Sequence, residues 1–197
     1  MTAQIQPQTG TDIWTESGPW RFTRESIIIG TTAETLLHLY QRTFAPLRIR
    51  AAARQLLTRE EFFGQLEDHR VDKYVAWQDD GQPVAIITLT RHLQSVPWIS
   101  PEYFAARFPE QWARNAVYYL GFACARPTAR RSPFLEMAVR MAIEPLALER
   151  AVIAYDVCAY NNSGLRISDR IAEVFRRHSS YLPEELDTQI YYGVNFA

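Results

Sequence analysis

The chain has 197 residues, 47% of them hydrophobic and 13% aromatic, which excludes a disordered or fibrous class and allows one sizeable core. Its net charge of -1 excludes a dedicated nucleic-acid binder, because phosphate-backbone binding needs a strongly basic field. No window approaches the roughly 18 apolar residues of a membrane span, and no signal-peptide pattern opens the chain. We therefore expect a cytoplasmic protein without a membrane span.

The chain begins with a stretch that carries few large apolar side chains. We expect residues 1–19 to form a leader outside the domain, and residues 20–197 to form a single domain. Apolar and β-branched residues over 20–29 predict the first strand. A helix follows, because Thr31 or Thr32 can cap it and leucines recur behind them at helical spacing.

A second helix, a hairpin and a long connection follow. The helix begins near Thr58, where Thr-Arg-Glu-Glu matches a capping box, and an Asp-Gly turn between two apolar runs predicts a hairpin over 74–89. The connection over 91–115 is rich in aromatic residues and contains a short helix that opens with Pro101. Two interpretations of this connection stay open: it covers a ligand cleft, or it packs as a satellite core under a loop.

The second half of the chain alternates strands and helices. An almost continuous apolar run predicts a strand over 117–125, covered on both faces. Apolar residues over 137–146 predict a helix, and 151–160 predicts the next strand. A helix over 164–178 and a strand over 189–194 complete the chain.

A basic turn separates the strand 117–125 from the helix after it. Arg130 and Arg131 precede Ser132, a good N-cap, and Pro133, which suits the first helical position. Because a helix N-terminus offers free N-H groups and a positive dipole end, this turn predicts a site for a phosphate-bearing ligand. The alternative is an ordinary helix start with two solvated arginines.

This order of elements resembles the GCN5-related N-acetyltransferase superfamily over about residues 20–196. The resemblance implies an α+β fold with a central mixed, mostly antiparallel sheet flanked by helices. In that family an Arg/Gln-x-x-Gly-x-Gly/Ala loop holds the pyrophosphate of the acyl donor. Arg130 matches the first position, whereas Pro133 and Leu135 replace the glycines. The loop is therefore degenerate, because these side chains hinder a close approach of the backbone to an anion.

A second motif lies after the strand 151–160. Asn161 and Gly164 match the Asn and Ala of the family's Asn-x-x-Ala-x-x-x-Tyr pattern, but Ser168 replaces the Tyr that protonates the departing thiolate. A serine hydroxyl is a poorer proton donor than a phenol.

The resemblance also implies the roles of particular residues. Tyr119 occupies the position of the glutamate base found in some members, and Asp156 is the nearest carboxylate, which faces either the cleft or a structural partner. The expected contacts with the acyl donor are Phe122, Ala123, Cys124, Arg130, Arg131, Ser132 and Asn161. Cys124 and Cys158 lack a suitably placed histidine, so we interpret both as small core residues rather than nucleophiles.

The implied activity is N-acyl transfer to a small-molecule amine from acetyl-CoA or a longer acyl-CoA, without a metal. The stretch over 97–112 is loosely similar to one in acyl-homoserine-lactone and N-acyl amino acid synthases, which adds acyl carrier protein as a candidate partner. A homodimer is also compatible with the sequence. The alternative is a catalytically degenerate member that binds a ligand or a protein.

Overall fold

The computed structural model describes residues 15–17, 20–126, 134–178 and 182–196. A six-stranded sheet lies at its centre with the strands in chain order, and neighbours are antiparallel except for the last pair, which is parallel. The strands are β1 (Thr15–Ser17), β2 (Trp20–Glu25), β3 (Val71–Gln78), β4 (Pro83–Thr90), β5 (Val117–Ala125) and β6 (Val152–Ala154). The predicted mixed, mostly antiparallel α+β fold is confirmed.

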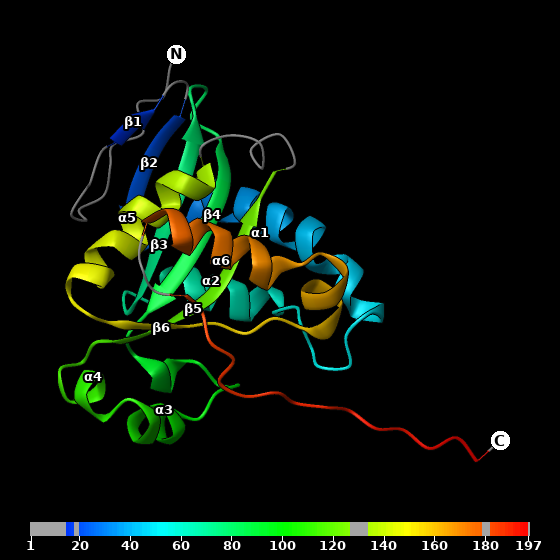
Figure 1. Ribbon diagram of the computed structural model, residues 1–197. Coiled ribbons are helices and arrows are strands. Elements are labelled where there is room, and N and C mark those ends of the chain that lie inside the picture. The colour runs from blue at the N-terminus through cyan, green and yellow to red at the C-terminus, as the bar shows by residue number, and fades with distance from the viewer. Residues whose placement is uncertain (1–14, 18–19, 127–133, 179–181, 197) are drawn as a thin grey trace.

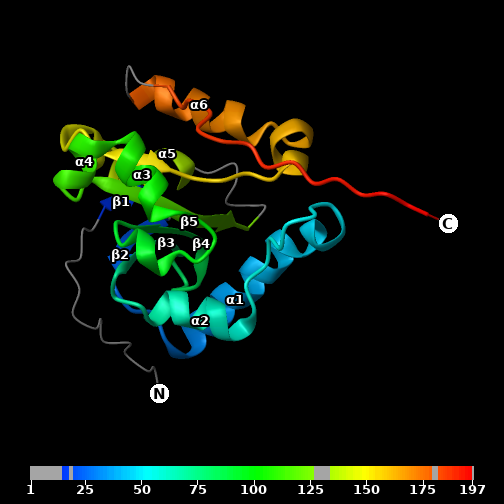
Figure 2. The same cartoon turned by 90° about the horizontal axis from the view of Figure 1, so that it is seen from below.

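Helices cover both faces of this sheet (Figures 1 and 2). The helices α1 (Gly30–Phe44) and α2 (Arg59–Glu67) cover one face, and α5 (Phe134–Leu148) and α6 (Ile167–His178) cover the other. Two short helices, α3 (Pro101–Arg107) and α4 (Pro109–Ala113), lie at the end of the sheet where β6 is found. Short turns of helix are η1 (Ala45–Ile49), η2 (Leu93–Ser95) and the π-helical η4 (Tyr160–Gly164). No described helix is long and apolar enough to cross a membrane.

Local sequence signals account for several of these elements. Thr58 accepts a hydrogen bond from the N-H of Glu61, and the Glu61 carboxylate accepts one from the N-H of Thr58, so the predicted capping box is present. Gly81 has φ +77° in the turn between β3 and β4, a conformation that favours glycine. Ser100 caps α3, which opens with Pro101 as predicted.

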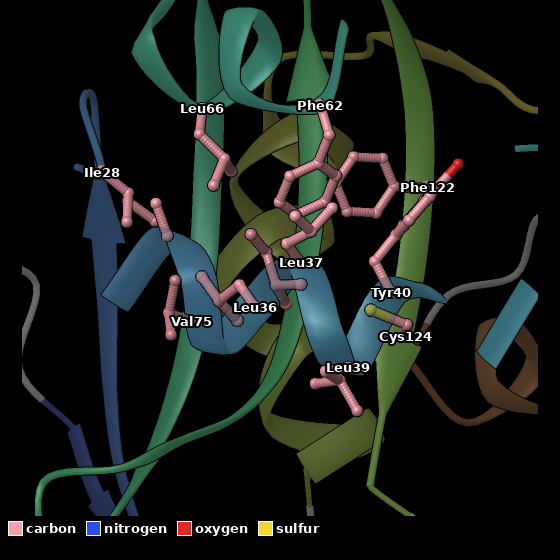
Figure 3. Close-up of a cluster of buried hydrophobic side chains, with 12 residues drawn as sticks. Ile28, Leu36, Leu37, Leu39, Tyr40, Phe62, Leu66, Val75, Phe122 and Cys124 are labelled. Carbon is pink, nitrogen blue, oxygen red and sulfur yellow. The ribbon is translucent and has the colours of Figure 1, made fainter. Parts of the chain in front are cut away.

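A buried cluster joins α1 and α2 to the sheet (Figure 3). Tyr40 of α1, Phe62 of α2 and Phe122 of β5 meet there, with ring centroids 4.9 to 5.6 Å apart. Contacts of this kind add to the hydrophobic gain from burying the rings. This cluster fixes the position of β5 against α1 and α2.

Lys73 is fully buried in β3, although it is the only lysine of the chain. Its ammonium group donates to the main-chain oxygens of Ser26 and Asp68, both at 2.6 Å. These two bonds join the segment after β2 to the segment after α2. Burial lowers the pKa of Lys73 to about 8, while the charges of Asp68 and Asp72 oppose that shift.

Three boundaries in the first half differ from the sequence prediction. The strand β2 ends at Glu25, because Ile28 turns into the core and the chain around it leaves the sheet. The helix α1 has Ile29 rather than a threonine at its N-cap. The strand β1 lies within the stretch expected as a leader and pairs with β2.

Two strands of the second half were predicted wrongly. The strand expected over 151–160 is reduced to β6, because only its first residues pair with β5. The strand expected over 189–194 is absent, and those residues are extended and exposed without a sheet partner. The expected start of α5 at Pro133 lies outside the described residues.

Candidate active site between β5 and β6

The last two strands of the sheet form a fork. They pair only from Val117 to Tyr119 on β5 and from Val152 to Ala154 on β6. Beyond these residues β5 continues to Ala125 beside β4, whereas the chain after β6 has no strand and diverges toward η4 (Figure 1). The edge of β5 over residues 120–125 is therefore not covered by a described strand.

A bulge in β5 follows shortly after Tyr119, the residue at which the pairing with β6 ends. Leu89 of β4 faces Leu120 and Ile87 faces Ala123, so Gly121 and Phe122 together oppose the single residue Thr88. The Thr88 hydroxyl accepts a hydrogen bond of 3.0 Å from the N-H of Phe122. A bulge of this kind inserts one residue and re-aims the side chains that follow it.

The bulge changes which side chains of β5 face each layer. Before it, Tyr118 and Leu120 pack in the cluster that contains residues of α5. After it, Phe122 and Cys124 pack with α1 and α2 instead. Strict alternation would have placed all four on one face. The bulge therefore turns Phe122 and Cys124 from the face covered by α5 to the face covered by α1 and α2.

Of the three strand residues expected to contact an acyl donor, Ala123 is the one whose N-H faces the fork. The N-H groups of Phe122 and Arg126 bond to β4, and successive N-H groups of a strand point to opposite edges. The side chain of Ala123 is exposed, whereas those of Phe122 and Cys124 are buried. Phe122 and Cys124 thus pack in the core, and Ala123 presents its main chain to the open edge.

The structure brings Tyr119 and Asp156 together at the base of the fork. The buried Tyr119 hydroxyl donates to the exposed Asp156 carboxylate through a very short hydrogen bond. The indole N-H of Trp98 donates to the same hydroxyl oxygen at 3.2 Å. Because the oxygen of Tyr119 accepts from Trp98, its own proton is directed to Asp156.

The environment of Tyr119 keeps its hydroxyl protonated. Burial raises its pKa, and the nearby Asp156 carboxylate raises it further, while the bond from Trp98 acts in the opposite direction. A phenol held in this form donates a hydrogen bond across the neutral range. Tyr119 is therefore suited to orient Asp156 and poorly suited to act as a base itself.

The aromatic connection over 91–115 packs against Tyr119. Phe104 of α3 meets the ring of Tyr119 edge to face at 6.4 Å, and Leu93 and Val96 pack in the same buried cluster. The connection thus forms a satellite core, and that core reaches the base of the fork through Trp98 and Tyr119. The satellite-core interpretation is confirmed, and the interpretation of this segment as the cover of a ligand cleft stays a prediction.

The other residues singled out from the sequence take no part in the hydrogen bond between Tyr119 and Asp156. Asn161 lies half-buried in the π-helical turn η4. The neighbouring Tyr160 is held by Arg50, which donates to its hydroxyl at 2.5 Å and lies over its ring at 4.6 Å. Cys124 is buried as predicted, and Cys158 is half-buried. Three predicted contacts lie outside the described residues, namely Arg130, Arg131 and Ser132.

Sequence reasoning missed the roles of Thr88 and Trp98. Thr88 lies in a run of buried strand residues, and nothing in its neighbourhood signals a bulge on the next strand. Trp98 lies in the aromatic connection, but its spacing from Tyr119 gives no sign of a contact across 21 residues. Among the described residues, no group of three or more His, Cys, Asp or Glu could hold a metal ion.

Comparisons with known proteins identify the fold of this chain. The sequence matches no protein-family model and no curated protein. The structure is similar to an aminoglycoside acetyltransferase, meta-AAC0020 from an uncultured soil metagenomic sample, with TM-score 0.50, 12% identity and coverage of 90% of this chain and 97% of that one. It is also similar to the aminoglycoside 6'-N-acetyltransferase AAC(6')-Ih of Acinetobacter baumannii, with TM-score 0.50, 13% identity and coverage of 90% and 99%.

The chain has the GCN5-related N-acetyltransferase fold. The similarity covers 90% of this chain and nearly the full length of both neighbours. At 12% and 13% identity, this likeness concerns the path of the backbone and not the chemistry of the site. The chemistry of the site therefore depends on its own residues.

Proposed function

We propose that this protein transfers an acyl group from acyl-CoA, or from an acyl carrier protein, to the nitrogen of a small-molecule amine. One observation carries the proposal. In an acetyltransferase fold, the base of the fork holds an exposed carboxylate, Asp156, oriented by the buried hydroxyl of Tyr119. A carboxylate held beside an open strand edge is suited to take a proton from an amine bound there.

In the proposed reaction the amine nitrogen attacks the thioester carbonyl. A nitrogen–carbon bond forms, the carbon–sulfur bond breaks, and the thiolate departs. The proton lost by the attacking nitrogen passes to Asp156. Tyr119 does not take that proton, because its raised pKa and its bond to Asp156 keep it a donor. Much of the rate enhancement would then come from positioning the two reactants.

The open edge of β5 fits the arm of an acyl-CoA or acyl carrier. That arm contains amide groups, which can bond to main-chain N-H and C=O groups as an added strand does. Ala123 offers such a group toward the fork, and its small exposed side chain leaves the approach free. We further propose that Arg130 and Arg131 meet the phosphates of the donor as charged partners.

A second candidate function is ligand binding without turnover. Pro133 and Leu135 replace the family's loop glycines, and Ser168 replaces its tyrosine. In the structure Ser168 lies half-buried in the first turn of α6. This combination favours a member that holds an acyl donor or a related ligand but lacks the usual proton donor for the thiolate.

Two measurements separate these functions. Isothermal titration with acetyl-CoA and longer acyl-CoA species tests binding, and release of free thiol across a panel of amines tests turnover. Acyl transfer predicts both signals, and binding alone predicts heat without thiol. The absence of heat with any CoA species would contradict both CoA-dependent versions, and acylated carrier protein would then be tested as donor.

The role of the fork is tested by substitution. We expect Asp156→Asn to lower kcat/KM at least a hundredfold, because it removes the group that accepts the proton of the amine. Tyr119→Phe should lower kcat/KM about tenfold, because Asp156 then loses the hydrogen bond that orients it. The matched control is Tyr118→Phe, which removes a neighbouring hydroxyl that bonds to Glu149. Equal losses in Tyr118→Phe and Tyr119→Phe would show a general effect on β5 rather than a role for the pair.

The basic turn is tested separately. Arg130→Ala combined with Arg131→Ala should weaken acetyl-CoA binding about tenfold or more and leave binding of a short pantetheine thioester unchanged, because that ligand lacks the nucleotide phosphates. Equal weakening for both ligands would contradict a phosphate contact.

A further inference from the structure

The stretch of chain around η1 and the connection to α2 is rich in positive charge. Residues 42–59 contain five arginines and no aspartate or glutamate, whereas the whole chain has a net charge of -1. Arg48 of η1 is exposed, and it forms no ion pair within the described part of the chain. A local excess of positive charge attracts anions to a surface.

A surface cavity of about 410 Å³ lies in this same connection, lined by residues 47–48 and 51–58. Arg48 and Arg54 contribute guanidinium groups to its lining, and the buried Leu47 and Leu56 contribute apolar side chains. A concave lining that is largely apolar and has a few polar groups is typical of small-molecule sites. The cavity is therefore suited to a ligand with one charged end and one apolar end.

The main chain beside the cavity has N–H groups without partners. Residues 51–58 belong to no helix or strand, and the N–H groups of residues 52–56 meet no acceptor within the described residues. Main-chain N–H groups of folded proteins are nearly always bonded to protein, water or a ligand. Runs of successive N–H groups in turns form concavities that bind anions. These donors are therefore available to an anionic ligand.

Arg54 is held in place at the cavity. Its guanidinium donates to both carboxylate oxygens of Glu61, at 2.5 and 2.7 Å, and to the main-chain oxygen of Leu56 at 3.3 Å. A guanidinium has five N–H donors, so these bonds leave donors over. The same ion pair offsets the negative charge of Glu61, which would otherwise repel an anion.

We propose that this cavity binds a small organic anion, namely a carboxylate or phosphate group joined to an apolar body. The anionic group accepts hydrogen bonds from Arg48 and from the N–H groups of residues 52–56. The apolar body lies against Leu47 and Leu56. Arg50 of the same connection donates to the hydroxyl of Tyr160 in η4 at 2.5 Å, so the site lies on a loop that is tied to the segment after β6. The inference does not depend on the proposed enzymatic function.

Titrations followed by the amide signals in nuclear magnetic resonance test the proposal. Benzoate and phenyl phosphate are the probes, and benzamide is the control because it has nearly the same shape without the charge. At least one of the two anions should shift the amide signals of residues 52–56 in a saturable manner, and benzamide should not. Absence of such shifts with both anions, or equal shifts with benzamide, would overturn the proposal.

A pair of arginine variants tests whether the cavity itself holds the anion. Arg48→Ala should raise the Kd of the bound probe about tenfold, because it removes a charged hydrogen-bond donor from the cavity. Arg42→Ala is the matched control, since Arg42 is also exposed and lies in the same basic stretch but does not line the cavity. Equal losses in the two variants would show attraction by the general positive field and would overturn the proposal.

Variants of the basic turn distinguish this cavity from the site proposed for the donor phosphates. Arg130→Ala combined with Arg131→Ala should leave the Kd of both anionic probes unchanged. The titration contains no acyl donor, so its outcome does not depend on whether the protein binds acyl-CoA. A rise in Kd as large as that in Arg48→Ala would place the anion at the basic turn and overturn the proposal.

Discussion

At the scale of single residues, Lys73 makes the stability of the protein depend on pH. Folding lowers its pKa from 10.5 to about 8. Between those values the unfolded chain holds its proton and the folded chain releases it, so stability rises as pH rises. We expect a gain of about 2 kcal/mol in the free energy of unfolding from pH 7 to pH 9.5, at 1.36 kcal/mol per pKa unit.

Urea unfolding across this pH range measures the gain, and Lys73→Met should remove it. Should that variant fail to fold, nuclear magnetic resonance gives the pKa directly, because one lysine gives one side-chain signal. A titration midpoint near 10.5 in the folded protein would contradict the prediction.

Gly121 and Thr88 form a second residue-scale constraint. A Cβ added at Gly121 would lie 2.8 Å from the Thr88 hydroxyl, the group that accepts the N-H of Phe122. Gly121→Ala should therefore destabilise the protein by about 1–3 kcal/mol through loss of that bond. With Thr88→Ala present, the same change should cost distinctly less, since the clashing atom is gone. Additive losses in denaturant unfolding would show that the two residues are independent.

At the scale of elements, the divergence of β5 from β6 creates the open edge at which we propose the site. Their pairing stops at Tyr119, and the main chain of Ala123 then faces an open edge. Ala123→Pro removes that N-H without removing a bond to β4, so affinity for acetyl-CoA should fall at least tenfold with a small change in Tm. Ala123→Ser keeps the N-H and is the control. An unchanged Kd for the proline variant would place the donor elsewhere.

The same element shows where sequence reasoning succeeds and fails. The bounds of β5 were predicted correctly, because a continuous apolar run is a local signal. Its bulge was not predicted, since the cause lies in Thr88 on another strand. Tyr119 and Asp156 were each singled out from the sequence, but their contact spans 37 residues and depends on how the strands diverge.

At the scale of the whole molecule, the order of elements was enough to predict the fold, because most helices and the longer strands carry their own periodic pattern. The C-terminal segment is the exception. Its alternation predicts a strand, but no described strand pairs with it. A local pattern describes the segment itself and carries no information about whether or where the segment pairs.

The burial of Lys73 also bears on how the protein would react with the acyl donors proposed above. Reactive thioesters acylate accessible amines without a catalyst, and lysine side chains are the usual acceptors. Here the one lysine is enclosed, with its ammonium bound by two carbonyl oxygens. Uncatalysed acylation of this lysine should therefore be slow, and peptide mass spectrometry should find Lys73 unmodified after incubation with an acyl-CoA.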